Sequence, residues 1–98
     1  MEKVLFAGEI KGIEHKTSKA GVPWAIVIGS YEVNVKEQSF EFTRRIYVLS
    51  ERLLNEIAKA RVGQSLFVEG RLEVEAFLND KNEPKASVKL VAERIDLF

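Results

Sequence analysis

The chain has 98 residues, enough for one domain over residues 1–98 with a single hydrophobic core. Its 15 basic and 15 acidic side chains cancel, so the net charge gives no sign of a polyanionic partner, and the absence of cysteine excludes disulfides, thiolate metal sites and cysteine nucleophiles. The N-terminal residues lack the apolar core of a signal peptide, and no apolar run approaches the roughly 18–20 residues that cross a bilayer. We therefore expect a cytoplasmic protein without membrane contact.

Apolar and polar residues alternate along most of the chain, which is the period of half-buried β-strands. Gly8 and Gly12 lie inside the first such segment, and glycine within a strand marks the bend or bulge that barrel closure requires. The first part of the chain is thus predicted to form three strands, over residues 3–13, 22–33 and 40–49, separated by polar connections over 15–21 and 34–39.

A helix is predicted after the third strand. Ser50 is its expected N-cap, because a serine hydroxyl accepts a hydrogen bond from a free amide of the first turn. Arg61 in the last turn and Gly63 just beyond it are typical stop signals. The helix is expected over residues 51–62, where four apolar residues have helical spacing: Leu53, Leu54, Ile57 and Ala58.

Two more strands complete the chain, over residues 64–78 and 85–98, joined by a polar turn over 79–84. Five strands with a single helix between the third and the fourth is the arrangement of the OB fold, a partly open Greek-key barrel. The sequence therefore predicts an all-β fold, a five-stranded OB-fold barrel with one α-helix. Element order alone leaves a different small α+β domain as the alternative.

Several stretches also resemble bacterial and phage single-stranded-DNA-binding (SSB) proteins. Residues 3–8 are similar to the opening strand of that family, and residues 45–48 to its third strand. The most specific piece is GQSLFVEGRL over residues 63–72, and the resemblance spans the whole chain. Residues 20–23 and 92–97 are similar to primosomal replication protein N (PriB), a branch of the family that stops soon after the last strand, as this chain does.

The resemblance implies a protein that binds single-stranded DNA with little sequence preference, in replication, repair or recombination, as an SSB or in the primosomal role of PriB. It also implies a homo-oligomer, a dimer or a tetramer, because relatives of both kinds associate through their first strand, with replication proteins as further partners. The sequence supports association, since the first strand carries more apolar residues than one barrel face needs: Val4, Leu5, Phe6, Ile10 and Ile13.

Binding of single strands needs aromatic rings on which bases stack and cations that follow the phosphates. On the third strand, Arg45 and Tyr47 have the parity that faces nucleic acid in the family, whereas Phe42, Ile46 and Val48 are expected in the core. Tyr47 also admits a purely packing role. On the fourth strand, Phe77 lies where the family has a stacking aromatic, although an oligomer contact or a ring covering the barrel rim also explains it. The opposite parity is expected in the core: Leu72, Val74, Ala76 and Leu78.

The remaining candidates are weaker. Trp24 shares parity with Ile26 and Ile28 and is expected in the core or in an interface, whereas Phe40 lies at the open end of its strand and remains a candidate for nucleic-acid contact. Five lysines fall in or beside the loops that would flank an OB groove, although each alone is also explained as a solvated charge: Lys16, Lys19, Lys36, Lys81 and Lys85.

Two departures from the family weaken the predicted groove. Glu73 and Glu75 stand where SSB relatives tend to have basic residues, and Thr43 replaces a central aromatic. Carboxylates repel phosphate, so the alternative function is an OB-fold protein-interaction module of a replication or phage complex.

An enzyme is the least favoured class. His15 is the only histidine, and the sequence has no metal-ligand spacing, phosphate-cradling glycine loop or nucleophile elbow. No catalytic residue, metal or cofactor is therefore expected.

Overall fold

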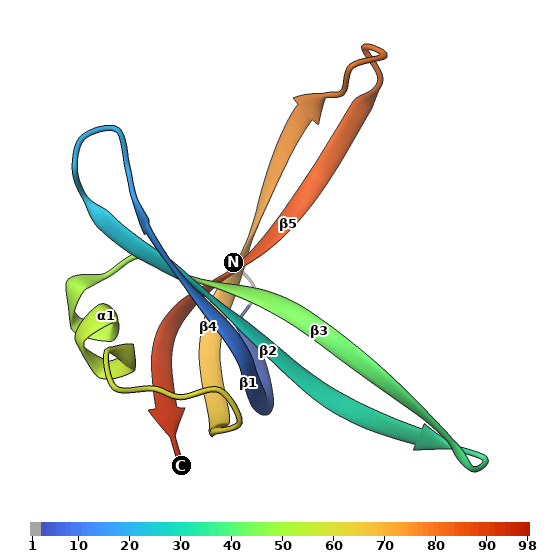
Figure 1. The fold of residues 1–98 in the computed structure, drawn as a ribbon. Coiled ribbons are helices and arrows are strands. Elements are labelled where there is room, and N and C mark those ends of the chain that lie inside the picture. The colour runs from blue at the N-terminus through green and yellow to red at the C-terminus, as the bar shows by residue number, and fades with distance from the viewer. Residues whose placement is uncertain (1–2) are drawn as a thin grey trace.

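The computed structural model describes residues 3–98, and its five strands close into a barrel in the order β1-β2-β3-β5-β4 (Figure 1). The single helix lies between the third and the fourth strand. The predicted OB-fold class is therefore confirmed. In chain order the elements are β1 (Lys3–Thr17), β2 (Pro23–Val35), β3 (Gln38–Val48), α1 (Glu51–Ile57), β4 (Ser65–Leu78) and β5 (Pro84–Leu97).

The barrel closes because β1 pairs with two neighbouring strands along its length. Its first half, from Lys3 to Glu9, pairs antiparallel with β4, and its second half, from Glu9 to Thr17, pairs antiparallel with β2. The register shifts between Ile10 and Gly12, so the strand has the bulge that its glycines predicted. The last seam is short, since β3 and β5 pair in parallel only at Ile46–Leu90 and Tyr47–Val91.

This bulge also revises the interpretation of the first strand. Phe6 and Ile10 are buried in the core before the bulge, and Ile13 packs against the core after it. A bulge changes which parity points inward. The mixed parity of the apolar residues in β1 is thus mostly a consequence of the bulge, and Leu5 alone among them is strongly exposed, at 65%.

The core contains side chains from every strand and from α1, whose Leu53 and Ile57 are buried. The predicted N-cap is confirmed, because the Ser50 hydroxyl accepts a hydrogen bond from the Leu53 amide at 3.2 Å. The helix ends at Ile57, earlier than the expected residue 62. Gly63 instead has a left-handed φ of 93° in the turn before β4, and its amide donates to the Ile10 carbonyl, which ties that turn to β1.

Three hairpins project from the barrel (Figure 1). The β1–β2 hairpin turns at residues 18–22. We call the outer part of the second hairpin, residues 31–42, the β2–β3 arm, and the outer part of the third, residues 73–89, the β4–β5 arm. The two arms lead away from the barrel in different directions (Figure 1).

The arms explain why part of the predicted core is wrong. Phe42, Val74 and Leu78 are 49%, 68% and 65% exposed, and Ala76 is exposed as well. Their strands continue past the end of the barrel, where alternation persists but no core remains to cover the apolar side. Ile46, Val48 and Leu72 lie nearer the barrel and are buried or packed against the core, as expected.

Candidate nucleic-acid interface

A groove crosses the outer face of the barrel between the β1–β2 turn and the β4–β5 arm. It has a volume of about 520 Å³. Its floor is the part of β2 and β3 where Ile26 pairs with Tyr47, and one wall is the beginning of the β4–β5 arm. The residues that line it are Ser18, Val22, Pro23, Trp24, Tyr47, Leu49, Glu73, Glu75, Lys89 and Val91.

Two aromatic rings lie together in this groove. The rings of Trp24 and Tyr47 are nearly parallel, with an interplanar angle of 8° and centroids 6.1 Å apart. We call this pair the aromatic platform. Tyr47 lies where the sequence predicted it, on the face turned away from the core, and its partner Trp24 was expected in the core or in an interface.

Of the two places expected for Trp24, the core is therefore wrong, and an interface stays a prediction. The core face of β2 is formed by Ala25 and Val27, both 0% exposed, and Trp24 and Ile26 point to the other side of the sheet. Both faces of this stretch are apolar, so parity alone did not show which one faced inward. The small size of Ala25 was the available signal, because a crowded barrel interior favours small side chains at some positions.

Lys89 is a groove cation that the sequence analysis did not single out. Its Nζ lies 5.3 Å from the centroid of the Tyr47 ring and 3.0 Å from a carboxylate oxygen of Glu75. The hydrogen bond that the Lys89 ammonium donates to the Glu75 carboxylate raises the pKa of Lys89 above its usual value. The approach of a cation to a ring face is itself favourable.

The other predicted residues of the barrel face lie at the edge of the groove. Arg45 of β3 and Lys16 of β1 both form ion pairs with Glu14, at 3.6 and 3.8 Å. Lys16 stands opposite Trp24 in the register of β1 with β2, in a strand rather than in the expected turn. Lys19 does lie in the turn between these strands.

The β4–β5 arm carries three further predicted residues. Phe77, 49% exposed, pairs directly with Lys85 of β5, and Lys81 lies in the turn at the tip of the arm. Phe77 has the same parity as Glu73 and Glu75, so the arm presents these side chains on one face. The two carboxylates line the groove, as the sequence suggested, and Glu73 pairs there with Arg71 at 3.0 Å.

Phe40 and Lys36 belong to a different part of the molecule. Phe40 is exposed on the β2–β3 arm, opposite Val33, and Lys36 occupies the two-residue turn at its tip with a positive φ of 49°. That arm extends away from the β4–β5 arm (Figure 1). The structure does not bring these two residues to the aromatic platform.

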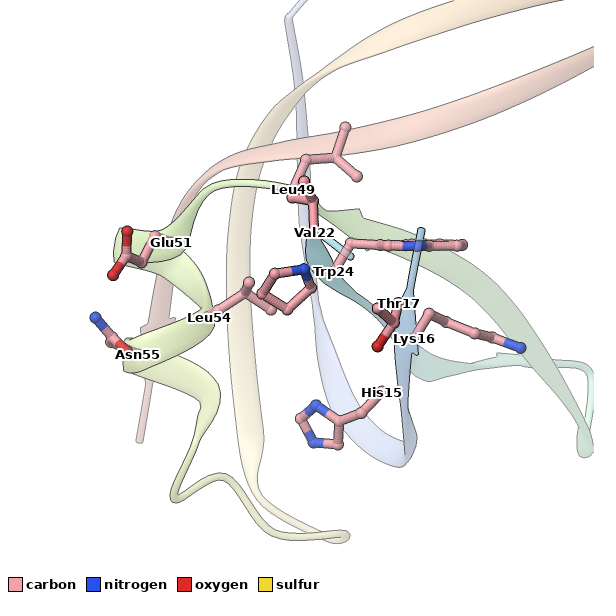
Figure 2. A pocket seen from close by; sticks show the side chains of 10 residues that line it. His15, Lys16, Thr17, Val22, Trp24, Leu49, Glu51, Leu54 and Asn55 are labelled. Atoms are coloured by element: carbon pink, nitrogen blue, oxygen red, sulfur yellow. The ribbon is translucent and has the colours of Figure 1, made fainter. Parts of the chain in front are cut away.

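A second cavity, of about 630 Å³, lies on the other side of Trp24, between the β1–β2 hairpin and α1 (Figure 2). In Figure 2 the Lys16 side chain and the Trp24 ring extend in the same direction, and Leu54 points from the helix toward β2. The Glu51 and Asn55 side chains point away from Leu54. His15, the only histidine, lines this cavity.

Two further features concern residues 3–98. No helix in this range has the length and apolar character needed to span a membrane. Nor do three or more histidine, cysteine, aspartate or glutamate side chains of this range gather as they would around a metal ion.

The fold is shared with several SSB proteins of known structure. The Plasmodium falciparum SSB, solved as a complex with single-stranded DNA, is 19% identical, with a TM-score of 0.76 over 99% of this chain and 92% of that one. Rim1, a mitochondrial single-stranded-DNA-binding protein of S. cerevisiae, is 21% identical, with a TM-score of 0.70 over 98% and 93%. The single-stranded-DNA-binding protein of Thermus aquaticus is 21% identical, with a TM-score of 0.79, and this chain spans 50% of its length.

No protein-family model matches the chain, and no curated protein sequence matches it. At the identities of the solved structures the likeness establishes the shared fold. The resemblance to SSB proteins that the sequence suggested is thus confirmed as a likeness of the whole chain fold.

Proposed function

We propose that this chain binds single-stranded DNA with little sequence preference, as a binding protein and not as an enzyme. The observation that carries this proposal is the aromatic platform of Trp24 and Tyr47 on the outer face of an OB barrel. Every base has an aromatic face, so stacking on such rings is tolerant of sequence. The solved complex of the P. falciparum SSB, which has the same fold, contains single-stranded DNA and supports this choice of ligand.

Each side chain of the interface has a proposed role in DNA binding. Bases stack on Trp24 and Tyr47, and the phosphates between them contact cations at the groove edge. The β4–β5 arm, with Phe77 opposite a lysine, continues the same track away from the barrel. The proposed phosphate contacts are Lys16, Arg45, Lys85 and Lys89, with Lys19 and Lys81 in the flanking turns.

A longer single-stranded DNA would also reach the β2–β3 arm. Its exposed Phe40 and the Lys36 at its tip supply a further ring and a further cation. The proposed cellular role is that of an SSB in replication, repair or recombination, or the primosomal role of PriB, with replication proteins as partners.

Titration with an oligo-dT provides the direct test, because Trp24 is the only tryptophan of the chain and reports from the platform itself. We expect saturable quenching of its fluorescence by oligo-dT and little change with duplex DNA of equal length. Binding should weaken with salt, with a log–log slope of about −0.7 for each phosphate contact. Absence of saturable binding at low salt would refute the proposal.

That negative result would favour the alternative, a protein-interaction module of a replication or phage complex. The observation behind the alternative is that Glu73 and Glu75 line the groove and pair with cations there. A groove whose cations are already neutralised attracts phosphate less strongly.

We further propose that the chain forms a homo-oligomer, a dimer or a tetramer, through β1. From Lys3 to Gly8 this strand pairs with β4 alone, so its other edge presents unpaired backbone groups, and Leu5 beside it is strongly exposed. Such an edge is a template for pairing with a second copy. A hollow of about 240 Å³ adjoins it, lined by Val4, Leu5, Phe6, Ala7, Tyr31 and Arg44.

Light scattering at micromolar concentration should give a mass of two or four chains of 11.1 kDa. Leu5→Lys should lower that mass, because it places a charge at the centre of the proposed interface. Lys11→Glu, a charge change on the same strand outside the exposed edge, serves as the control and should leave the mass unchanged. A wild-type mass of one chain would contradict association.

A further inference from the structure

The cations beside the aromatic platform are already in contact with carboxylates. Lys89 pairs with Glu75, and Arg45 and Lys16 share Glu14. Glu14 differs from Glu75 because it is bound by cations from two strands that are not adjacent, β1 and β3, with β2 between them. No local pattern in the sequence marks Glu14.

A single oxygen of Glu14 meets both cations. Its Oε2 lies 3.6 Å from a terminal nitrogen of Arg45 and 3.8 Å from Nζ of Lys16. In the registers of β1 with β2 and of β2 with β3, Glu14 stands opposite Ile26, and Ile26 stands opposite Tyr47. The oxygen therefore marks a point beside the platform at which one anionic oxygen contacts two cations.

We propose that this point is a phosphate-binding subsite, filled by the Glu14 carboxylate in the free protein and by a backbone phosphate in the complex with single-stranded DNA. The inference rests on the proposed function and adds to it a position for one phosphate and a residue that competes for it. A phosphate oxygen carries the same charge as a carboxylate oxygen and accepts the same hydrogen bonds from lysine and arginine.

Exposure makes the exchange feasible. The side chains of Arg45, Lys16 and Glu14 are 60%, 45% and 43% exposed, so the ion pairs lie in a medium where such pairs are weak. Glu14 can leave the subsite and be hydrated without a buried charge being left behind. A phosphate held close by the stacking of its bases on the platform can then take the place of the carboxylate.

The matched pair of variants is Glu14→Gln and Glu9→Gln. Glu9 also lies on β1, is similarly exposed, and pairs with the lysine two residues further along, Lys11, at 3.7 Å. It lines a different hollow, away from the platform. Both substitutions remove one negative charge and free one lysine on the same strand, but only Glu14→Gln also frees Arg45.

We expect Glu14→Gln to tighten binding of oligo-dT about 3- to 10-fold at low salt, whereas Glu9→Gln should change it less than about 2-fold. In the wild type the phosphate replaces the Glu14 carboxylate on the two cations, so this contact releases few counterions. Without that carboxylate the contact releases counterions, and the log–log salt slope of Glu14→Gln should be more negative by up to about 0.7. The gain should be clearly smaller in the Arg45→Gln background, where Lys16 is the only cation of the subsite that Glu14→Gln still frees.

Equal effects of the two glutamate substitutions, or an undiminished gain in the Arg45→Gln background, would overturn the subsite and leave the proposed function standing. Absence of binding by the wild type and by every variant would overturn the proposed function itself. The two failures are therefore distinguishable in one set of titrations.

Discussion

Replacement of Trp24 by alanine is expected to weaken binding of single-stranded DNA by about 1–3 kcal/mol, roughly a 5- to 150-fold increase in the dissociation constant. The expectation follows from the position of the ring, nearly parallel to Tyr47 at the floor of the groove. Removal of the ring takes away the stacking surface of at least one base. The variant has no tryptophan, so its affinity is measured from the anisotropy of a labelled oligo-dT.

Trp24→Leu separates stacking from packing. Trp24 is partly buried, so the alanine variant also loses contacts with the protein. Leucine keeps much of the apolar bulk but has no flat ring, and it should bind nearly as weakly as alanine while its melting temperature stays closer to that of the wild type. Wild-type affinity in Trp24→Leu would show that the residue acts by packing and would contradict the platform.

The fold was predictable because its signals are local and repeated. Alternation identified the strands, the Ser50 cap identified the start of the helix, and Gly12 identified the bulge in β1. Each of these features depends on a few neighbouring residues. The predicted helix end was wrong because Arg61 and Gly63 are equally compatible with a turn. The Gly63 amide donates a hydrogen bond to the carbonyl of Ile10, a residue distant in the sequence, and so ties that turn to β1.

The extent of the barrel was not predictable from alternation. Phe42 and Val74 have the parity of the core, but they lie on arms that have left it. A period of two reports which side of a strand a residue occupies, and says nothing about whether another layer covers that side. The length of a strand relative to its barrel is a tertiary property.

The site depends on tertiary structure still more strongly. Arg45 and Tyr47 were found from their shared parity and from the face that binds nucleic acid in the family they resemble; Tyr47 lines the groove, and Arg45 pairs with Glu14 beside it. Trp24 was missed because both faces of its stretch are apolar, and Lys89 and Glu14 were missed because the residues they contact lie on other strands. Ion pairs such as those of Glu14 join residues far apart in the sequence and leave no local pattern.

The second large effect is expected from Gly70→Ala, which should destabilise the fold by roughly 3 kcal/mol or more, at or above the upper end for overpacked sites. A Cβ at this position would lie 2.3 Å from the carbonyl oxygen of Val91 and 3.1 Å from Cδ1 of Leu90. The first contact is with backbone, which cannot rotate away as a flexible side chain can. Relief requires β5 to move relative to β4 at the bulge between Glu69 and Gly70.

Movement of β5 there would reach both the barrel seam and the groove. Val91 pairs with Tyr47 across the short parallel seam and lines the groove, and Lys89 lies two residues before it on the same strand. For a domain of this size a loss of about 3 kcal/mol lowers the melting temperature by more than about 10 °C, which thermal unfolding followed by circular dichroism measures directly. Affinity for oligo-dT should fall at temperatures where the variant remains folded.

Gly12→Ala is the matched control, because Gly12 also lies within a strand beside a bulge. Its added Cβ would have Ile28 Cδ1 at 3.7 Å as its nearest neighbour, an ordinary contact, and its φ lies outside the left-handed region. Alanine there should change stability by less than about 1 kcal/mol, since the smaller conformational freedom of the unfolded chain offsets any crowding. Equal melting temperatures for the two variants would mean that β5 moves relative to β4 with little loss of stability. The seam beside Tyr47 would then not hold the groove in place.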